Sequence, residues 1–512
     1  MMLKTLALSA ALIATLPCAA APAADLGLAP VPARPSPSVL KPGWEHGAFM
    51  EIFVRGYQDS NGDGIGDLRG LTRRLDYLKD LGIKGIWLMP ITASSDHDHG
   101  YATTDYRSIE RDYGSLEDFD ALIKAAHARS IGVIIDYVLN HASLQSPLFQ
   151  DAAYRDWFVW QDQMPLGWEV LDHNPWTATP TGSYYGTFGG HMPDFNLRNA
   201  AALEYHFSSL RFWLNRGLDG FRLDAVPHLI ENDKEHWNDQ PESRALTHDV
   251  QMLIKSYPKA HVVCEATANP AAYAQPEVCG SAFGFGFQEA AIQAAQGKPE
   301  AVQHLAAYFT QAPLSMATML SNHDIFAGHR VWDQLSGDEA RYKLAAASYL
   351  LMPGTPFIYY GEEIGMAGLN DLPGDQPIRA PMSWNADGKG FSGSKPYRAF
   401  SPNGATHNPD VERKNPASLL NFYKAMLGLR NSRASIAQGS YEAASADGLA
   451  LRFERRLGKE RSIVLINYGD AAADVAGVPA GARLLYPLAK AQPGHLPAHS
   501  VQVLAADEST PR

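Results

Sequence analysis

Cysteine is scarce in this sequence: only Cys18, Cys264 and Cys279 occur among its 512 residues. Cys18 lies in an N-terminal segment that we expect to be removed, so at most one disulfide can form in the mature chain. A small scaffold held together by several disulfides is therefore excluded. The sequence leaves open whether Cys264 and Cys279 pair.

Positive charge is also in deficit, with 43 Lys and Arg against 55 Asp and Glu and a formal net charge of -12. Proteins that bind nucleic acid concentrate Lys and Arg, so we expect no nucleic-acid partner and favour a neutral or cationic ligand. With 46 % hydrophobic and 19 % charged residues, the composition is that of a globular protein with a large core.

Long hydrophobic runs are absent beyond the N-terminus. The apolar run from Leu6 to Leu16 is shorter than the roughly 20 residues that span a bilayer. Lys4 precedes this run and the small residues "AAAPAAD" follow it, which is the pattern of a secretory signal peptide. We predict a signal peptide over 1–23, export to the periplasm or the medium, and no membrane association. Residues 24–44, rich in proline, are interpreted as an extended linker.

Short apolar segments alternate with amphipathic helical segments for nearly 400 residues. The eight strand-like segments are 49–57, 83–90, 131–138, 218–226, 261–266, 283–288, 317–324 and 356–363. Helices are predicted between them, for example over 116–129 and 202–216. Eight such units predict a (β/α)₈ TIM barrel, with an open doubly wound sheet as the alternative. "GSAFGFGF" lacks the G-x-G-x-x-G spacing, so no nucleotide cofactor is expected.

Two regions depart from the barrel pattern. Residues 142–199 separate the third strand from its helix by more than a normal loop and are predicted to form an inserted domain. Its tryptophans could stack on sugars, but most are expected to form the insert's own core. Residues 434–512 carry short β-type runs and are predicted to form a C-terminal antiparallel β-sandwich. The barrel itself is assigned to 45–141 and 200–433.

Charged residues occur where the predicted barrel strands end. "GFRLDAVPH" (220–228) places Arg222 and Asp224 on the same face of an otherwise apolar strand. Asp136, Glu265 and Asp324 end three other strands, and His141 and His323 lie close by in the sequence. So many like charges at one barrel mouth would repel one another, which favours a functional site over a structural one.

Two carboxylates, one ionised and one protonated, are the machinery of glycoside hydrolysis. Arg222 would hold Asp224 ionised, as a nucleophile requires. Glu265 follows the apolar residues "HVVC", a setting that would raise its pKa and suit it to donate a proton.

Four short motifs carry a resemblance to a known family. "DYVLNH", "GFRLDAVPH", "VVCEA" and "MLSNHD" follow one another along the chain, and the predicted insert contains "MPDFN". In this order they resemble the motifs of the α-amylase family, glycoside hydrolase family 13, over roughly residues 45 to 510. The resemblance implies a secreted, bacterial-type α-amylase or α-glucosidase.

The resemblance also implies roles for individual residues. Asp224 would be the nucleophile, Glu265 the general acid and base, and Asp324 a stabiliser of the transition state. The residues implied to line or support the sugar site are His141, Arg222, His323, Asp136, which would hold Arg222, and Tyr101, which would stack on the sugar.

The loop "DSNGDGIGD" (59–67) offers oxygen ligands at alternate positions, from Asp59, Asn61, Asp63, the carbonyl of Ile65, and Asp67. Such a set suits a hard cation, and the loop resembles the calcium loop of many family members. We therefore expect structural calcium. Gly70 stands where an EF-hand would place its last ligand, so the loop is not an EF-hand. The alternative is an Asx-rich turn without metal.

Two departures from the α-amylase pattern bear on the substrate. Pro227 and His228 stand where α-amylases of the family often carry Lys and His. Asp98 and Arg379, the latter in "IRAPMSW", are similar to residues that close the cleft of exo-acting α-glucosidases.

The first hypothesis is an α-amylase that cleaves α-1,4 bonds of starch-type glucans and maltooligosaccharides, with or without transglycosylation. The alternative is an exo-acting α-glucosidase or an oligo-1,6-glucosidase-like enzyme. The catalytic trio disfavours a third hypothesis, a member that only binds carbohydrate. A monomer is expected, because the sequence shows no N-terminal dimerisation module of the cyclomaltodextrinase type.

Overall fold

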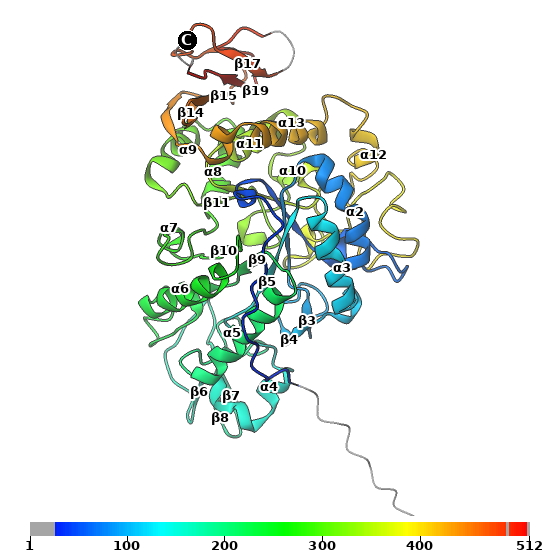
Figure 1. Ribbon diagram of the computed structural model, residues 1–512, viewed down its shortest axis with the longest axis vertical. Helices are drawn as coiled ribbons and strands as arrows, with labels where there is room; N and C mark the ends of the chain where they lie inside the picture. The colour runs from blue at the N-terminus through cyan, green and yellow to red at the C-terminus, as the bar shows by residue number, and fades with distance from the viewer. Residues whose placement is uncertain (1–25, 488–490, 509–512) are drawn as a thin grey trace, which may run out of the picture.

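The computed structural model describes residues 26–487 and 491–508 (Figure 1). The signal peptide predicted over 1–23 lies outside the described residues. Among the helices that are described, none combines the length and the apolar character needed to cross a bilayer.

A parallel sheet forms the centre of the molecule. Its seven strands are β1 (Phe49–Ile52), β2 (Gly85–Leu88), β5 (Gly132–Tyr137), β9 (Gly220–Leu223), β10 (His261–Cys264), β11 (Ala317–Thr318) and β12 (Thr355–Tyr359). They pair in the order β10-β9-β5-β2-β1-β12-β11. All of their residues are buried, as expected for parallel strands that are covered on both faces.

A short sixth segment closes this sheet into a barrel. Ala282 makes a parallel bridge to Cys264 at one edge of the sheet, and Phe283 makes one to Ala317 at the other. The predicted (β/α)₈ barrel is therefore confirmed. Cys264 and Cys279 form a disulfide, which ties β10 to the chain that leads into the sixth segment.

The strand predicted over 283–288 is wrong in its extent, since only its first residue takes part in the barrel. A side chain at Gly284 would meet the Tyr308 hydroxyl at 2.6 Å, and Gly286 has a φ of +92°. These glycines turn the chain directly into helix α8, so no further strand residues can follow.

Helices surround the barrel. The long ones are α2 (Leu68–Leu81), α3 (Leu116–His127), α5 (Ala200–Asn215), α6 (Pro241–Lys255), α8 (Phe287–Ala295), α9 (Pro299–Gln311), α11 (Glu339–Leu351) and α13 (Leu419–Ser432). Single-turn helices are α1 (Val54–Tyr57), α4 (Pro147–Gln150), α7 (Pro270–Tyr273), α10 (Val331–Gln334) and α12 (Pro409–Glu412). Helix α3 begins with a capping box between Ser115 and Asp118.

Residues 142–199 leave the barrel between β5 and α5. They contain α4 and a three-stranded antiparallel sheet, in the order β6 (Trp160–Gln161), β8 (Gly182–Tyr185) and β7 (Trp176–Thr179). Three of its tryptophans pack within the insert: Trp168 lies 5.8 Å from Trp176 between ring centroids, and Trp160 stacks on Phe149. Trp157 also contacts Tyr205 of helix α5. A second small hairpin, β3 (Thr92–Ser94) and β4 (Thr103–Ile109), follows β2.

The C-terminal region is an antiparallel β structure at one end of the molecule (Figure 1). A five-stranded sheet has the order β13 (Glu442–Asp447), β14 (Ala450–Leu457), β15 (Glu460–Asn467), β19 (Ser500–Ala505) and β17 (Arg483–Tyr486), beside the pair β16 (Ala473–Asp474) and β18 (His495–Leu496). The predicted start at residue 434 is too early, because Ala434–Gln438 form helix α14.

The proline-rich segment before Trp44 is extended and lies along the barrel's outer surface (Figure 1). Helix α5 holds it at two points. The Val31 amide donates to the Ser208 hydroxyl over 3.0 Å, and the Arg34 amide donates to the Asn215 side chain over 2.8 Å. The segment is therefore part of the folded body.

Candidate active site

The polar residues predicted at the strand ends meet at one mouth of the barrel. Asp136 and Arg222 lie in β5 and β9, and Asp224, Glu265 and Asp324 follow β9, β10 and β11. After Asp224 the chain turns sharply at Ala225, whose φ is +49°. The Ala225 amide donates to Glu265 Oε2 over 3.0 Å, so the turn after β9 fixes the carboxylate that follows β10.

Arg222 is the cation at the centre of the acidic cluster. Its guanidinium lies 2.8 Å from Asp136 Oδ1, 2.5 Å from Asp224 Oδ1 and 2.9 Å from Glu265 Oε2. Arg222 is buried, and its contacts with these three carboxylates offset both their mutual repulsion and its own loss of hydration. Arg222 of strand β9 and Asp224, which follows that strand, thus form the centre of this charge network.

Burial and charge act in opposite directions on the two candidate catalytic carboxyls. Burial raises the pKa of Asp224, and Arg222 opposes this rise. Burial likewise raises the pKa of Glu265, where Arg222 again opposes the rise and the negative charge of Asp324 adds to it. A raised pKa suits the proton-donating role predicted for Glu265. At Asp224, the Arg222 guanidinium 2.5 Å away is the charge that favours the ionised form.

His323 links a second set of carboxylates. Its Nδ1 lies 2.6 Å from Glu51 Oε1, and its Nε2 lies 3.1 Å from Asp324 Oδ2. Burial alone would lower the pKa of His323, but Asp324 and Glu51 outweigh burial and raise it to about 10. Burial would raise the pKa of Asp324, but His323, followed by Arg379, reverses the effect and holds it below its ordinary value.

The raised pKa of His323 predicts a pH dependence of stability. Protonated His323 stabilises the fold fully below the pKa of an unfolded histidine, about 6.5, and this contribution is lost as the pH rises through about 10. In calorimetry, the melting temperature of His323→Asn should fall furthest below the wild type near pH 6, and the gap should close toward pH 10. A gap that is constant with pH would contradict this role.

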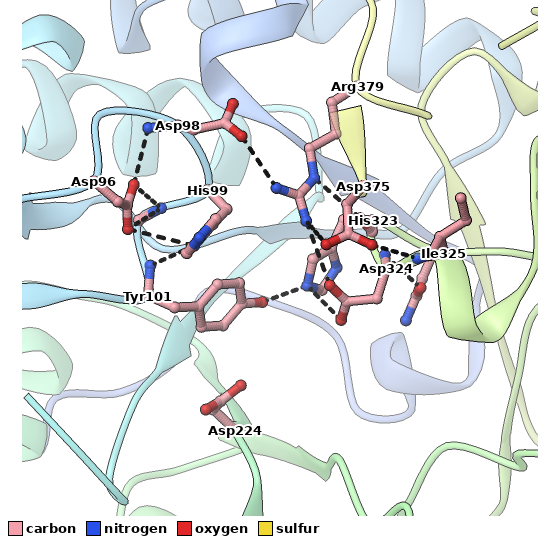
Figure 2. A network of polar contacts seen from close by, with 12 residues as sticks. Asp96, Asp98, His99, Tyr101, Asp224, His323, Asp324, Ile325, Asp375 and Arg379 are labelled. Carbon is pink, nitrogen blue, oxygen red and sulfur yellow. Dashed lines mark hydrogen bonds and ion pairs between the residues drawn. The ribbon is translucent and has the colours of Figure 1, made fainter. Parts of the chain in front are cut away.

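Tyr101 lies against this network (Figure 2). Its ring stacks on His323 with centroids 5.4 Å apart and an interplanar angle of 15°. Its hydroxyl donates to Asp136 Oδ2 over 2.8 Å and lies 2.6 Å from His323 Nε2. The ring is thus held firmly, as a platform for a sugar requires.

His141 approaches the site from the insert side. It is buried, and its Nε2 has no hydrogen-bond partner among the described residues. Burial lowers the pKa of His141 to about 3, which keeps the imidazole neutral near pH 7. Phe188 lies 5.1 Å from the His141 ring and 5.5 Å from the His228 ring between centroids. An unpartnered neutral nitrogen in this position can bind a hydroxyl group of a ligand.

Asp98 and Arg379 form an ion pair, here named the closing pair, beside Asp324 (Figure 2). Arg379 lies 3.3 Å from Asp98 Oδ2 and 3.4 Å from Asp324 Oδ1, and its Nε donates to the His323 carbonyl. Asp98 is also 3.3 Å from Arg398, which donates to the Arg379 carbonyl. Residues after β2 and β12 are thereby joined across one side of the site.

Three residues of this network were not predicted from the sequence. Glu51 is buried in β1, and a charged residue in an apolar strand is the same signal that identified Arg222. Asp375 accepts from the Ile325 amide over 2.8 Å and pairs with Arg379 at 3.4 Å. Arg398, like Asp375, comes from a loop with no periodic pattern, so no signal was available for either.

The loop at 59–67 folds around its own polar groups. Asp59 accepts from the amides of Asn61, Gly62 and Gly64 and from the Ser392 hydroxyl, and Asp67 caps helix α2. The loop contains three carboxylates and no Lys or Arg, a composition that suits a hard cation. Its three carboxylates do not converge on one point, since the cluster of the described residues whose ligand atoms lie close enough to share an ion is His97, Glu110 and Asp112.

The fold and the site together define a class of enzyme. A TIM barrel with paired acids at the C-terminal ends of its strands is an arrangement of glycosidases. A family model described as "Alpha amylase, catalytic domain" matches residues 51–439. The chain belongs to the α-amylase family of glycoside hydrolases, family 13, and is a glycosidase.

Relatives and solved structures agree with this assignment. Alpha-amylase 3 of Dictyoglomus thermophilum is 34 % identical over 83 % of this chain and 85 % of that protein. A trehalose synthase/amylase of Mycolicibacterium smegmatis is 32 % identical over 78 % of this chain and 78 % of that protein. A probable alpha-glucosidase of Rhizobium meliloti is 31 % identical over 85 % of this chain and 92 % of that protein. The crystal structure of an alpha-amylase from H.orenii superposes with a TM-score of 0.79 at 33 % identity, covering 91 % of this chain and all of that one.

Proposed function

We propose that the enzyme removes single glucosyl units from the non-reducing ends of short α-glucans by a retaining mechanism. The observation that carries this proposal is the closing pair. Because Arg379 contacts both Asp98 and Asp324, the closing pair would limit the glycone side of the site to one sugar and stop a longer chain from continuing past it. The open side then receives the rest of the substrate.

In the first step, Asp224 attacks the anomeric carbon and the bond to the leaving oxygen breaks. Glu265 transfers its proton to that oxygen, so the shortened glucan leaves with a free hydroxyl group and Glu265 becomes a carboxylate. Arg222, in contact with both carboxylates, stabilises the negative charge that moves from Asp224 to Glu265.

In the second step, Glu265 accepts a proton from a water molecule, whose oxygen attacks the anomeric carbon and breaks that carbon's bond to Asp224. Glucose is released, Asp224 is again ionised and Glu265 is again protonated. Asp324, kept ionised beside His323, stabilises the positive charge that develops on the sugar ring. Proton NMR of the first turnovers should detect α-glucose; β-glucose as the first product would contradict the double displacement.

Internal cleavage of α-1,4-glucans is the second candidate. It is favoured by the similarity to Alpha-amylase 3 over most of both chains. In that case the closing pair would have to separate when a long chain binds.

We also propose that calcium binds the loop at 59–67 through Asp59, Asn61, Asp63, the Ile65 carbonyl and Asp67. The cation would offset three carboxylates in nine residues, so its removal should lower the melting temperature by several degrees. Calorimetry with and without EDTA, followed by added calcium, measures the effect. No change with EDTA would show that the loop is a metal-free turn.

A further inference from the structure

An exposed aromatic side chain lies beside the candidate catalytic groups. Phe326 comes two residues after Asp324 and is 59 % exposed. Its ring contacts Phe285, with centroids 5.5 Å apart and an interplanar angle of 38°. Phe285 is partly buried against a core cluster of the barrel. One part of the Phe326 ring therefore packs on Phe285, while the rest of the Phe326 side chain is exposed to solvent.

The position of this pair in the barrel relates it to the leaving group. Phe285 follows the sixth segment, which lies next to β10, and Glu265 follows β10 directly. The closing pair comes instead from the loops after β2 and β12, which flank β1. In Figure 2, Ile325, which precedes Phe326, lies on the far side of Asp324 from Asp98.

The general acid protonates the oxygen that joins the two sugars, so the leaving sugar lies on the side of Glu265. The closing pair blocks the other side. Phe285 follows the segment next to β10, so the Phe285–Phe326 pair lies on the Glu265 side of Asp324 and not on the Asp98 side (Figure 2).

We infer that Phe285 and Phe326 form a platform for the sugar ring on the leaving side of the scissile bond. This inference rests on the proposed function. An exposed aromatic face suits the apolar C–H face of a hexopyranose, while the sugar hydroxyls stay in water. The platform binds a maltooligosaccharide leaving group or, in transfer, an acceptor sugar, and so contributes to the choice of substrate.

The test compares substrates that differ on the leaving side alone. Maltotriose has sugar rings there, whereas α-glucosyl fluoride has a single atom. For Phe326→Ala, the ratio of kcat/KM on maltotriose to kcat/KM on α-glucosyl fluoride should fall about tenfold, mainly through KM for maltotriose. Phe326→Trp should restore the ratio. Leu457→Ala, which truncates a 42 % exposed residue in the C-terminal β region, is the matched control.

An unchanged ratio in Phe326→Ala would overturn the inference, and so would equal losses on both substrates, which would indicate a structural role. Failure of the wild-type enzyme to act on either substrate would instead refute the proposed function, and the platform with it. The two failures are therefore distinguishable.

Discussion

Asp224→Asn should reduce kcat on maltotriose by about 10⁴-fold or more, while the melting temperature stays the same or rises. The amide cannot form the glucosyl ester, so the first step has no nucleophile. Stability should not suffer, because the substitution removes a buried negative charge and Arg222 keeps its contacts with Asp136 and Glu265. Steady-state kinetics and calorimetry on the same preparation measure both effects.

The matched control is Asp387→Asn, which makes the same chemical change on an exposed aspartate paired with Lys389. It should leave kcat and the melting temperature unaltered. Residual hydrolysis within about tenfold of the wild type in Asp224→Asn would exclude Asp224 as the nucleophile.

Asp98→Ala should change the length preference of the enzyme. Without Asp98, Arg379 and Arg398 lose their shared partner, and the glycone side of the pocket opens. Catalytic efficiency on maltose should fall by about tenfold to a hundredfold, since a charged hydrogen-bonding group is lost. Internal cleavage of maltoheptaose should increase at the same time.

Asp371→Ala, at an exposed position on the loop that carries Asp375, controls for general effects on that loop. Equal losses on maltose and maltoheptaose in Asp98→Ala, with no new products, would contradict a closing role for the pair. Product chromatography on both substrates separates the two outcomes.

The sequence was sufficient to predict the barrel, because fully buried parallel strands require apolar segments whatever their surroundings. It failed at the sixth segment, where Gly284 and Gly286 interrupt an apolar run that looks like a strand. It also placed the start of the C-terminal β region too early, because residues 434–438 are helical. Nothing in the sequence could decide that Cys264 and Cys279 pair, since pairing depends on their distance in the fold.

The candidate site was predictable where a residue follows a strand, because all strands of a barrel deliver their C-terminal ends to one mouth. Asp224, Glu265 and Asp324 belong to this group. Asp375 and Arg398 do not, since long loops position them and their contacts depend on how those loops fold. Export, calcium binding and a monomeric state stay predictions from the sequence.

The central claim is that one sugar at a time enters a closed pocket. The most direct test is a time course with maltoheptaose labelled at its reducing end. The proposal predicts labelled chains that shorten by one unit at a time while unlabelled glucose accumulates. Labelled fragments of several lengths in the first minutes would mean internal cleavage and would contradict it.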